Sequence, residues 1–299
     1  MPPDPGHLDP GGLLPQAIRP HWPAPPGITA LMSTRRGGVS AMPFDSLNLR
    51  PPVLGADAAG AADHPEAVAE NQRRFAAALG AVPVWLNQVH GARVVHLGNL
   101  HLDRLQLGSQ RPRPASFDSG LRLHPLALAL PMADASICTQ PGIACAVLVA
   151  DCLPVLLCSA DGKAVGAAHA GWRGLAAGVI DNTVAALCAA ARCAPDQLLA
   201  WLGPCIGPAA FEVGAEVLRA FGASPDRPDP AVFVPASRAD GSLCWQGNLA
   251  ELARRRLAAL GVVQVSGGGE CTVANASRFF SYRRDRRTGR MAAAIAIQS

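Results

Sequence analysis

The hydrophobic positions of the chain predict a set of short buried strands. Apolar runs are separated by Gly, Pro or Asp, a pattern typical of strands that are buried on both faces. The run 83–89 leads directly to His90, so this strand places a histidine at its end. The predicted strands are residues 28–34, 83–89, 143–149, 155–158, 164–168 and 199–202.

Helices are predicted where apolar residues recur at the spacing of a helical turn. Residues 65–79 are rich in helix formers and carry this spacing. Further helices are predicted from the Gly-rich turn 171–174 onward, over 213–221 and over 249–260. Strands and helices mix without the steady alternation of a doubly wound sheet, and no internal repeat is found. The pattern therefore favours an α+β fold in a single domain.

Two segments lack such patterns. Residues 1–26 are crowded with Pro and Gly and have neither a basic n-region nor an apolar h-region, so they do not resemble a secretory signal. We expect a disordered Pro/Gly-rich leader over 1–26 and ordered structure from about Ile28. Residues 98–131 show no clear period and contain the run Arg-Pro-Arg-Pro at 111–114. We interpret them as a surface insertion in a catalytic domain of residues 27–299.

Composition limits the classes of protein. The longest apolar stretch is broken by Asp151 and Pro154, which argues against a membrane span. Nine cysteines without an export signal indicate reduced thiols, and hence a cytoplasmic protein. The net charge is only +4 and is clustered in short arginine runs, which does not indicate nucleic-acid binding. We expect a monomer or a weak homo-oligomer.

His90, Cys152 and His169 are the strongest candidates for chemistry. Zinc prefers imidazole nitrogen and thiolate sulfur, and a catalytic zinc keeps a fourth position open. Their spacing is wide, however, and neither Cys-x-x-Cys nor His-Glu-x-x-His occurs, so spacing alone does not reveal a metal. The Cys152 thiol lies beside Asp151 at a strand break, where a reactive cysteine would be displayed. A nucleophilic cysteine with a histidine base, as in a cysteine hydrolase, fits the same residues.

Eight sequence blocks, in order, resemble the multicopper polyphenol oxidase (laccase-domain) family, also called the YfiH family. The resemblance covers nearly all of the chain outside the leader. The blocks are Ser33-Thr34-Arg35 with Gly37-Gly38-Val39-Ser40, Ser46-Leu47-Asn48-Leu49, Asn87-Gln88-Val89-His90-Gly91, Ala133-Asp134-Ala135, Ala150-Asp151-Cys152-Leu153-Pro154, His169-Ala170-Gly171-Trp172-Arg173-Gly174, Gly203-Pro204-Cys205-Ile206-Gly207 and Phe279-Phe280-Ser281-Tyr282-Arg283-Arg284.

This resemblance implies a mixed αβ sandwich and a zinc-dependent purine nucleoside phosphorylase. Members of the family are described as acting on adenosine, guanosine, inosine and methylthioadenosine with phosphate, with adenosine deaminase activity in the same pocket. By the matching blocks, His90, Cys152 and His169 would be both the metal ligands and the catalytic residues. The chain departs from the family pattern at two places, which affect the expected rim of the pocket. These are the long insertion and the sequence of residues 50–62.

Substrate contacts are expected from three residues. Arg173 follows Gly171 at the start of a predicted helix, where unpaired backbone donors attract anions such as phosphate. Arg35, on a Gly-rich loop, and Asn48, in one of the shared blocks, are the other two candidates. No proton shuttle for deamination stands out, and the candidates for it are Asp151, Glu212 and Tyr282.

Other functions make different predictions. A laccase needs several coppers held by many histidines, and this chain has eight histidines and no His-x-His pair, so a multicopper cluster is not expected. Copper could still replace zinc at a single nitrogen and sulfur site. A basic binding module that uses Arg283 to Arg287 would bind nucleic acid in a strongly salt-dependent way.

Overall fold

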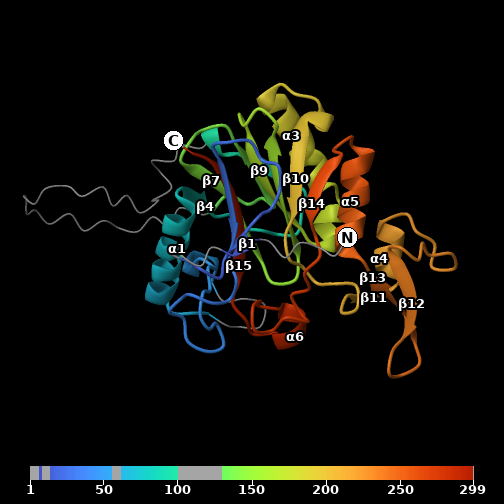
Figure 1. Cartoon of the computed structure of the whole chain (residues 1–299). Helices are drawn as coiled ribbons and strands as arrows, with labels where there is room; N and C mark the ends of the chain where they lie inside the picture. Colours follow the sequence, from blue (N-terminus) through green and yellow to red (C-terminus); the bar gives the residue numbers. More distant parts are fainter. Residues whose placement is uncertain (1–6, 9–13, 56–61, 100–129, 299) are drawn as a thin grey trace, which may run out of the picture.

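In the computed structural model, two six-stranded sheets face each other and helices cover their outer faces (Figure 1). The structure describes residues 7–8, 14–55, 62–99 and 130–298. The predicted insertion therefore lies mostly outside the described residues, as does most of 1–13. Within the described ranges, no helix combines the length and the apolar character that a membrane span requires.

The first sheet is antiparallel except at one edge, where β4 runs parallel to β7. β15 lies at its centre, between β3 and β7. In spatial order its strands are β1 (His7–Leu8), β2 (Ile18–Arg19), β3 (Ile28–Met32), β15 (Met291–Ile297), β7 (Ile143–Val149) and β4 (Val82–Val84).

The second sheet carries two of the three candidate ligands near one end of its central strands. The antiparallel pair of β8 and β9 lies at its centre, and the turn before β8 holds Cys152. In spatial order the strands are β14 (Gln264–Gly267), β10 (Leu198–Leu202), β8 (Leu153–Ser159), β9 (Val165–Ala170), β6 (Ala135–Cys138) and β5 (Val94–His96).

The central strand of the first sheet, β15, carries no polar residue because both of its faces are covered. In β15, Met291, Ala293 and Ile295 pack between the two sheets, and the alternating alanines pack on the opposite face. Successive side chains of a strand point to opposite faces, so each of these apolar runs fills two layers of the core.

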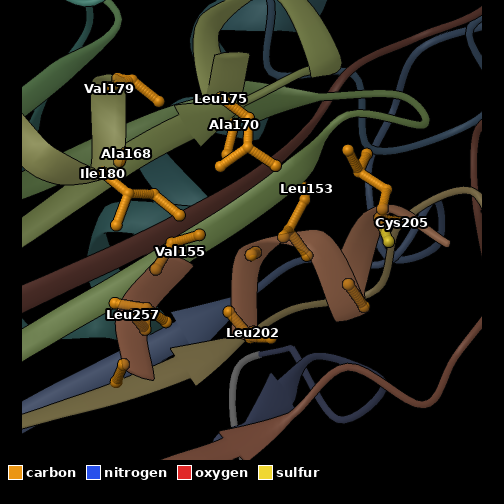
Figure 2. Close-up of a cluster of buried hydrophobic side chains, with 14 of the residues drawn as sticks. Leu153, Val155, Ala168, Ala170, Leu175, Val179, Ile180, Leu202, Cys205 and Leu257 are labelled. Atoms are coloured by element: carbon orange, nitrogen blue, oxygen red, sulfur yellow. The ribbon is translucent and has the colours of Figure 1, made fainter. Parts of the chain in front are cut away.

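Helices close the two outer layers. α1 (Pro65–Leu79) covers the first sheet. α2 (Trp172–Ala176), α3 (Val179–Ala191) and α5 (Leu249–Ala259) cover the second sheet. Figure 2 shows this second layer, in which Leu175, Ile180 and Leu257 from the helices meet Val155 and Ala168 from the strands.

A third, three-stranded sheet projects beside α5 (Figure 1). Its spatial order is β11 (Glu212–Val213), β13 (Leu243–Gly247) and β12 (Phe233–Ser237). The short helices α4 (Ala215–Ala220) and α6 (Tyr282–Asp285) complete the described α-helices, and three 3₁₀ turns are Pro52–Leu54, Leu97–Asn99 and Pro195–Gln197.

The mixed α/β sandwich is confirmed, with differences in detail. The strand predicted over 83–89 ends at Val84, and the helix predicted from 171 is interrupted at Gly178, whose φ is +90°. Ordered structure also begins earlier than the predicted Ile28: Ile18 pairs with Met32, and both side chains are buried. The apolar residues Leu14, Ala17 and Ile18 join the core, although the surrounding Pro and Gly suggested a disordered leader.

Candidate metal centre

Three separate segments bring His90, Cys152 and His169 together. His90 lies on the loop after β4, Cys152 in the turn between β7 and β8, and His169 in β9. The pairing of β8 with β9 places Leu153 opposite Ala170 and Pro154 opposite His169, so the thiol and one imidazole come from neighbouring strands. The sequence prediction that these residues converge agrees with the structure.

The separation of the Cys152 thiol from the His90 imidazole fits two ligands of one tetrahedral zinc ion. The Cys152 Sγ and His90 Nε2 atoms are 3.7 Å apart, and the candidate ligand atoms all lie within 4.8 Å of one another. Bonds of about 2.3 Å to sulfur and about 2.0 Å to nitrogen give tetrahedral neighbours a separation of about 3.5 Å. His169 is buried, Cys152 is half-buried and His90 is exposed, so the site opens on the His90 side.

A fourth residue, Asp134, connects the two histidines. Its fully buried carboxylate lies 2.8 Å from His169 Nδ1 and accepts hydrogen bonds from the backbone N–H groups of Val89, His90 and Gly91. Sequence reasoning did not assign a role to this residue, although the block Ala133-Asp134-Ala135 contains it. Its only signal in the sequence was its place in that block, and its carboxylate was recognised as a partner of His169 from the structure.

Glycines are required where the turn of α2 approaches the site. A Cβ atom on Gly171 would lie 2.8 Å from Cys152 Sγ and 3.1 Å from His90 Cδ2. A Cβ atom on Gly174 would lie 2.9 Å from the carbonyl oxygen of Gly91. The absence of side chains at both positions lets the α2 turn pack directly against the candidate ligands.

Charge interactions shift the pKa values of the buried pair in opposite directions. Burial disfavours the Cys152 thiolate, but the positive charge on His169 and hydrogen bonds from both imidazoles outweigh it and lower the pKa of Cys152 to about 6. Burial also disfavours the His169 imidazolium, yet the Cys152 and Asp134 charges raise the pKa of His169 to about 9. The thiolate, which is the form that binds metals, therefore exists at neutral pH.

Asp151 has a structural task beside the site. Its backbone has a φ of +97°, and its carboxylate accepts hydrogen bonds from Thr272 Oγ1 and from the backbone N–H of Arg283, each at 2.6 Å. These contacts join the turn that carries Cys152 to the C-terminal segment. The sequence interpretation of Asp151 as a residue that orients the site fits this geometry better than a role as proton shuttle.

The candidate ligands line a cavity of about 540 Å³, a volume within the usual range of small-molecule sites. Among the described residues, its wall is formed by aromatic side chains, several arginines and a single carboxylate, that of Asp151. The aromatic residues are Trp172, Phe211 and Tyr282, and the arginines are Arg50, Arg173, Arg283, Arg286 and Arg290.

Two of the three predicted substrate residues do not line this cavity. Arg35 donates to the backbone oxygens of Asp45 and Ala276 and stacks over Phe280. Asn48 is buried and holds its loop, since its side-chain oxygen accepts from the backbone N–H of Arg290. Only Arg173 reaches the cavity.

The two weaker candidates for the proton shuttle, Glu212 and Tyr282, differ in their position relative to the cavity. Glu212 forms an ion pair with Arg238 and does not line the cavity, whereas Tyr282 does.

The fold and the site define a two-sheet sandwich with a cluster of nitrogen and sulfur ligands that lines an arginine-rich cavity. Residues 29–298 match the family described as multi-copper polyphenol oxidoreductase laccase. The chain belongs to this family, as the eight sequence blocks predicted. Within the part of the chain that the structure describes, His90, Cys152 and His169 form the only cluster of three or more such ligands.

Similar proteins agree in length and fold. "Purine nucleoside phosphorylase YfiH" of Escherichia coli is 45% identical over 93% of this chain and 97% of that protein. "Purine nucleoside phosphorylase PA4543" of Pseudomonas aeruginosa is 43% identical over 94% and 98%. Among solved structures, YlmD of Geobacillus stearothermophilus superimposes with a TM-score of 0.78 at 29% identity, over 99% of this chain and 100% of that one. The Neisseria meningitidis protein NMB0706 gives 0.75 at 38% identity, over 95% and 100%.

Proposed function

We propose that this chain is a zinc-dependent purine nucleoside phosphorylase of the cytoplasm. The observation that carries the proposal is the convergence of one thiol and two imidazoles in the wall of a cavity that arginines and aromatic side chains also line. The names of relatives that match over nearly their whole length support the same reaction. In it, a phosphate oxygen bonds to ribose C1′ while the bond from C1′ to the purine nitrogen breaks, which yields the free base and ribose 1-phosphate.

His90, Cys152 and His169 would hold the zinc ion, which fits their donor atoms and the 3.7 Å separation of Cys152 Sγ from His90 Nε2. When bound, zinc supplies a Lewis-acid charge in the wall of the cavity. Asp134 keeps the Nδ1 side of His169 occupied and so directs the other ring nitrogen toward the site. Copper remains the alternative occupant of such a nitrogen and sulfur site.

Phosphate would bind at Arg173 and Arg286. Both line the cavity, and neither guanidinium has an ion-pair partner within the described residues. Each lies against an aromatic ring: Arg173 stacks on Trp172, 4.4 Å from the ring centroid, and Arg286 lies 5.7 Å from the ring of Tyr282. Such stacking holds the arginines in place while their N–H groups stay available for an anion. The helix that follows Gly171 has only five residues, so the arginines, and not a helix dipole, are the main anion donors.

The aromatic side chains would bind the purine. Trp172, Phe211 and Tyr282 all line the cavity, and a purine ring can stack on any of these faces. We expect adenosine, inosine, guanosine and methylthioadenosine to fit, because stacking does not depend on the substituents of the ring.

The test is incubation of zinc-loaded protein with each nucleoside, with and without phosphate, followed by product analysis. Phosphate-dependent release of free base and ribose 1-phosphate is the expected result, and no release from any purine nucleoside would refute the proposal. Conversion of adenosine to inosine without phosphate would add the proposed deaminase activity. The Arg173→Ala variant, which keeps Cys152, serves as the comparison. It should use phosphate less well and bind as much zinc as the parent.

A cysteine hydrolase is a second candidate, and one observation favours it. Asp134, His169 and Cys152 form a series in which a carboxylate orients an imidazole that in turn lowers the pKa of a thiol. The two candidates differ in their response to a chelator. Zinc removal should abolish phosphorolysis, whereas a hydrolase should keep its activity without metal and lose it when Cys152 is alkylated.

A further inference from the structure

We propose that Asp134 is a positioning residue that sets the geometry of both histidines of the metal centre. Its two carboxylate oxygens share four contacts. Oδ1 lies 2.8 Å from His90 N and 2.8 Å from His169 Nδ1, and Oδ2 accepts from Val89 N at 3.1 Å and Gly91 N at 2.7 Å. The inference rests on the proposed metal site and does not depend on which nucleoside the enzyme uses.

The contact with His169 determines which ring nitrogen can bind a metal. A carboxylate only accepts hydrogen bonds, so Nδ1 carries the proton that faces Asp134. Nε2 is then the nitrogen left for the ion, on the side of the ring that meets Cys152. Asp134 also fixes the ring from the main chain, because its carbonyl oxygen accepts from the backbone N–H of His169 at 2.7 Å.

The contacts with residues 89–91 hold the other histidine. His90 has a φ of +60°, a left-handed conformation that residues with a side chain rarely adopt. Three consecutive N–H groups turn inward around it and converge on the one carboxylate of Asp134. His90 is exposed, so few packing contacts compete with this anchor. Asp134 therefore maintains the loop conformation that directs His90 toward Cys152.

An amide cannot replace this carboxylate in either orientation. In Asp134→Asn one oxygen becomes an NH₂ group, which is a donor. If the NH₂ occupies the Oδ1 position, it opposes His90 N–H and favours the wrong tautomer of His169. If it occupies the Oδ2 position, it opposes the N–H groups of Val89 and Gly91. The first orientation leaves His90 N–H, and the second leaves Val89 and Gly91 N–H, without an acceptor on residue 134, and each displaces one of the two histidines.

The experiment compares Asp134→Asn with Asp161→Asn, using zinc alone as the probe. Asp161 also accepts from a hydroxyl and a backbone N–H, those of Ser159 and Lys163, but it lies in the β8–β9 turn, at the end of these strands away from the candidate ligands. Competition with a chromophoric chelator should show zinc affinity about 10- to 100-fold lower in Asp134→Asn and unchanged in Asp161→Asn. Circular dichroism checks that both variants fold. A folded Asp134→Asn with the zinc affinity of the parent would overturn the proposal.

A second measurement on the unaltered chain covers the case in which Asp134→Asn fails to fold. Nitrogen NMR of the zinc-loaded protein should show His169 protonated at Nδ1 and metal-bound at Nε2. Zinc on Nδ1, or a His169 without a proton on Nδ1, would contradict the positioning role. Neither measurement needs a nucleoside. A failure of the positioning role of Asp134 can therefore be told apart from an absence of phosphorylase activity.

Discussion

Gly171→Ala is the perturbation whose size follows most directly from the structure. Gly171 has φ −64° and ψ 158°, values that alanine adopts without strain, so any effect must come from the new methyl group. That methyl would lie 2.8 Å from Cys152 Sγ, about 0.6 Å short of an ordinary contact, which begins at 3.4 Å. Metal–ligand distances in genuine sites lie within about 0.2 Å of their standard values, so a shift of about 0.6 Å is large on this scale. We therefore expect zinc affinity to fall by at least about tenfold, as for other changes that displace a ligand.

The assay is competition for zinc between the protein and a chromophoric chelator, with thermal unfolding recorded in parallel. Gly98→Ala is the control, because a Cβ there meets the flexible end of Gln140 at 3.3 Å and lies away from the cavity. The control should bind zinc as the parent does. A Gly171→Ala protein with parental zinc affinity would refute the argument that the α2 turn fixes the position of the thiol.

Three further outcomes test the site. The pKa of His169 is raised to about 9 and that of Cys152 is lowered to about 6, so zinc binding between these pH values must displace a proton from His169. Zinc affinity should therefore rise with pH up to about 9 and level off above it, and calorimetry in buffers of different ionisation enthalpy should detect the released proton. Arg173→Ala should raise the KM for phosphate at least about fivefold with little change in melting temperature, and an unchanged KM would remove Arg173 from the phosphate site. Arg35→Ala should do the reverse, lowering the melting temperature through its lost bonds to Asp45 while the KM for phosphate stays the same, as steady-state kinetics and calorimetry will show.

The sequence pattern predicts the helices and the core strands well where periodicity and end signals agree. The helix over 65–79 has the predicted bounds because Pro65 begins it and Gly80 ends it in a left-handed conformation. The strand over 143–149 also has its predicted bounds, since its apolar run fills both core layers. Local signals sufficed for these elements.

Where the sequence pattern failed to predict a strand or its end, contacts with other parts of the chain determine the structure. The run 83–89 leaves the sheet after Val84, because the side chain of Gln88 takes the place of a strand backbone beside Leu148. The Gln88 amide donates to the carbonyl oxygen of Leu148 and accepts from its backbone N–H. β15 was not predicted, because its alanines favour a helix and only the neighbouring β3 and β7 draw it into the sheet.

The candidate site was predicted in part. The three proposed ligands were found through the sequence blocks, and not through their spacing, because a loop, a turn and a strand far apart along the chain bring them together. Arg35 and Asn48 lie in the same kind of block but hold the loop near α1 and α6, which no local pattern distinguishes from substrate binding. Asp134 was passed over because a single carboxylate between alanines carries no periodic or motif signal of its own.

The most direct test of the central claim is X-ray absorption at the zinc edge of protein loaded with one equivalent of zinc. The account predicts one sulfur ligand at about 2.3 Å and two imidazole nitrogens at about 2.0 Å, with the sulfur lost in Cys152→Ala. A first shell of nitrogen and oxygen alone in the unaltered chain would contradict it, because zinc would then bind somewhere other than at His90, Cys152 and His169.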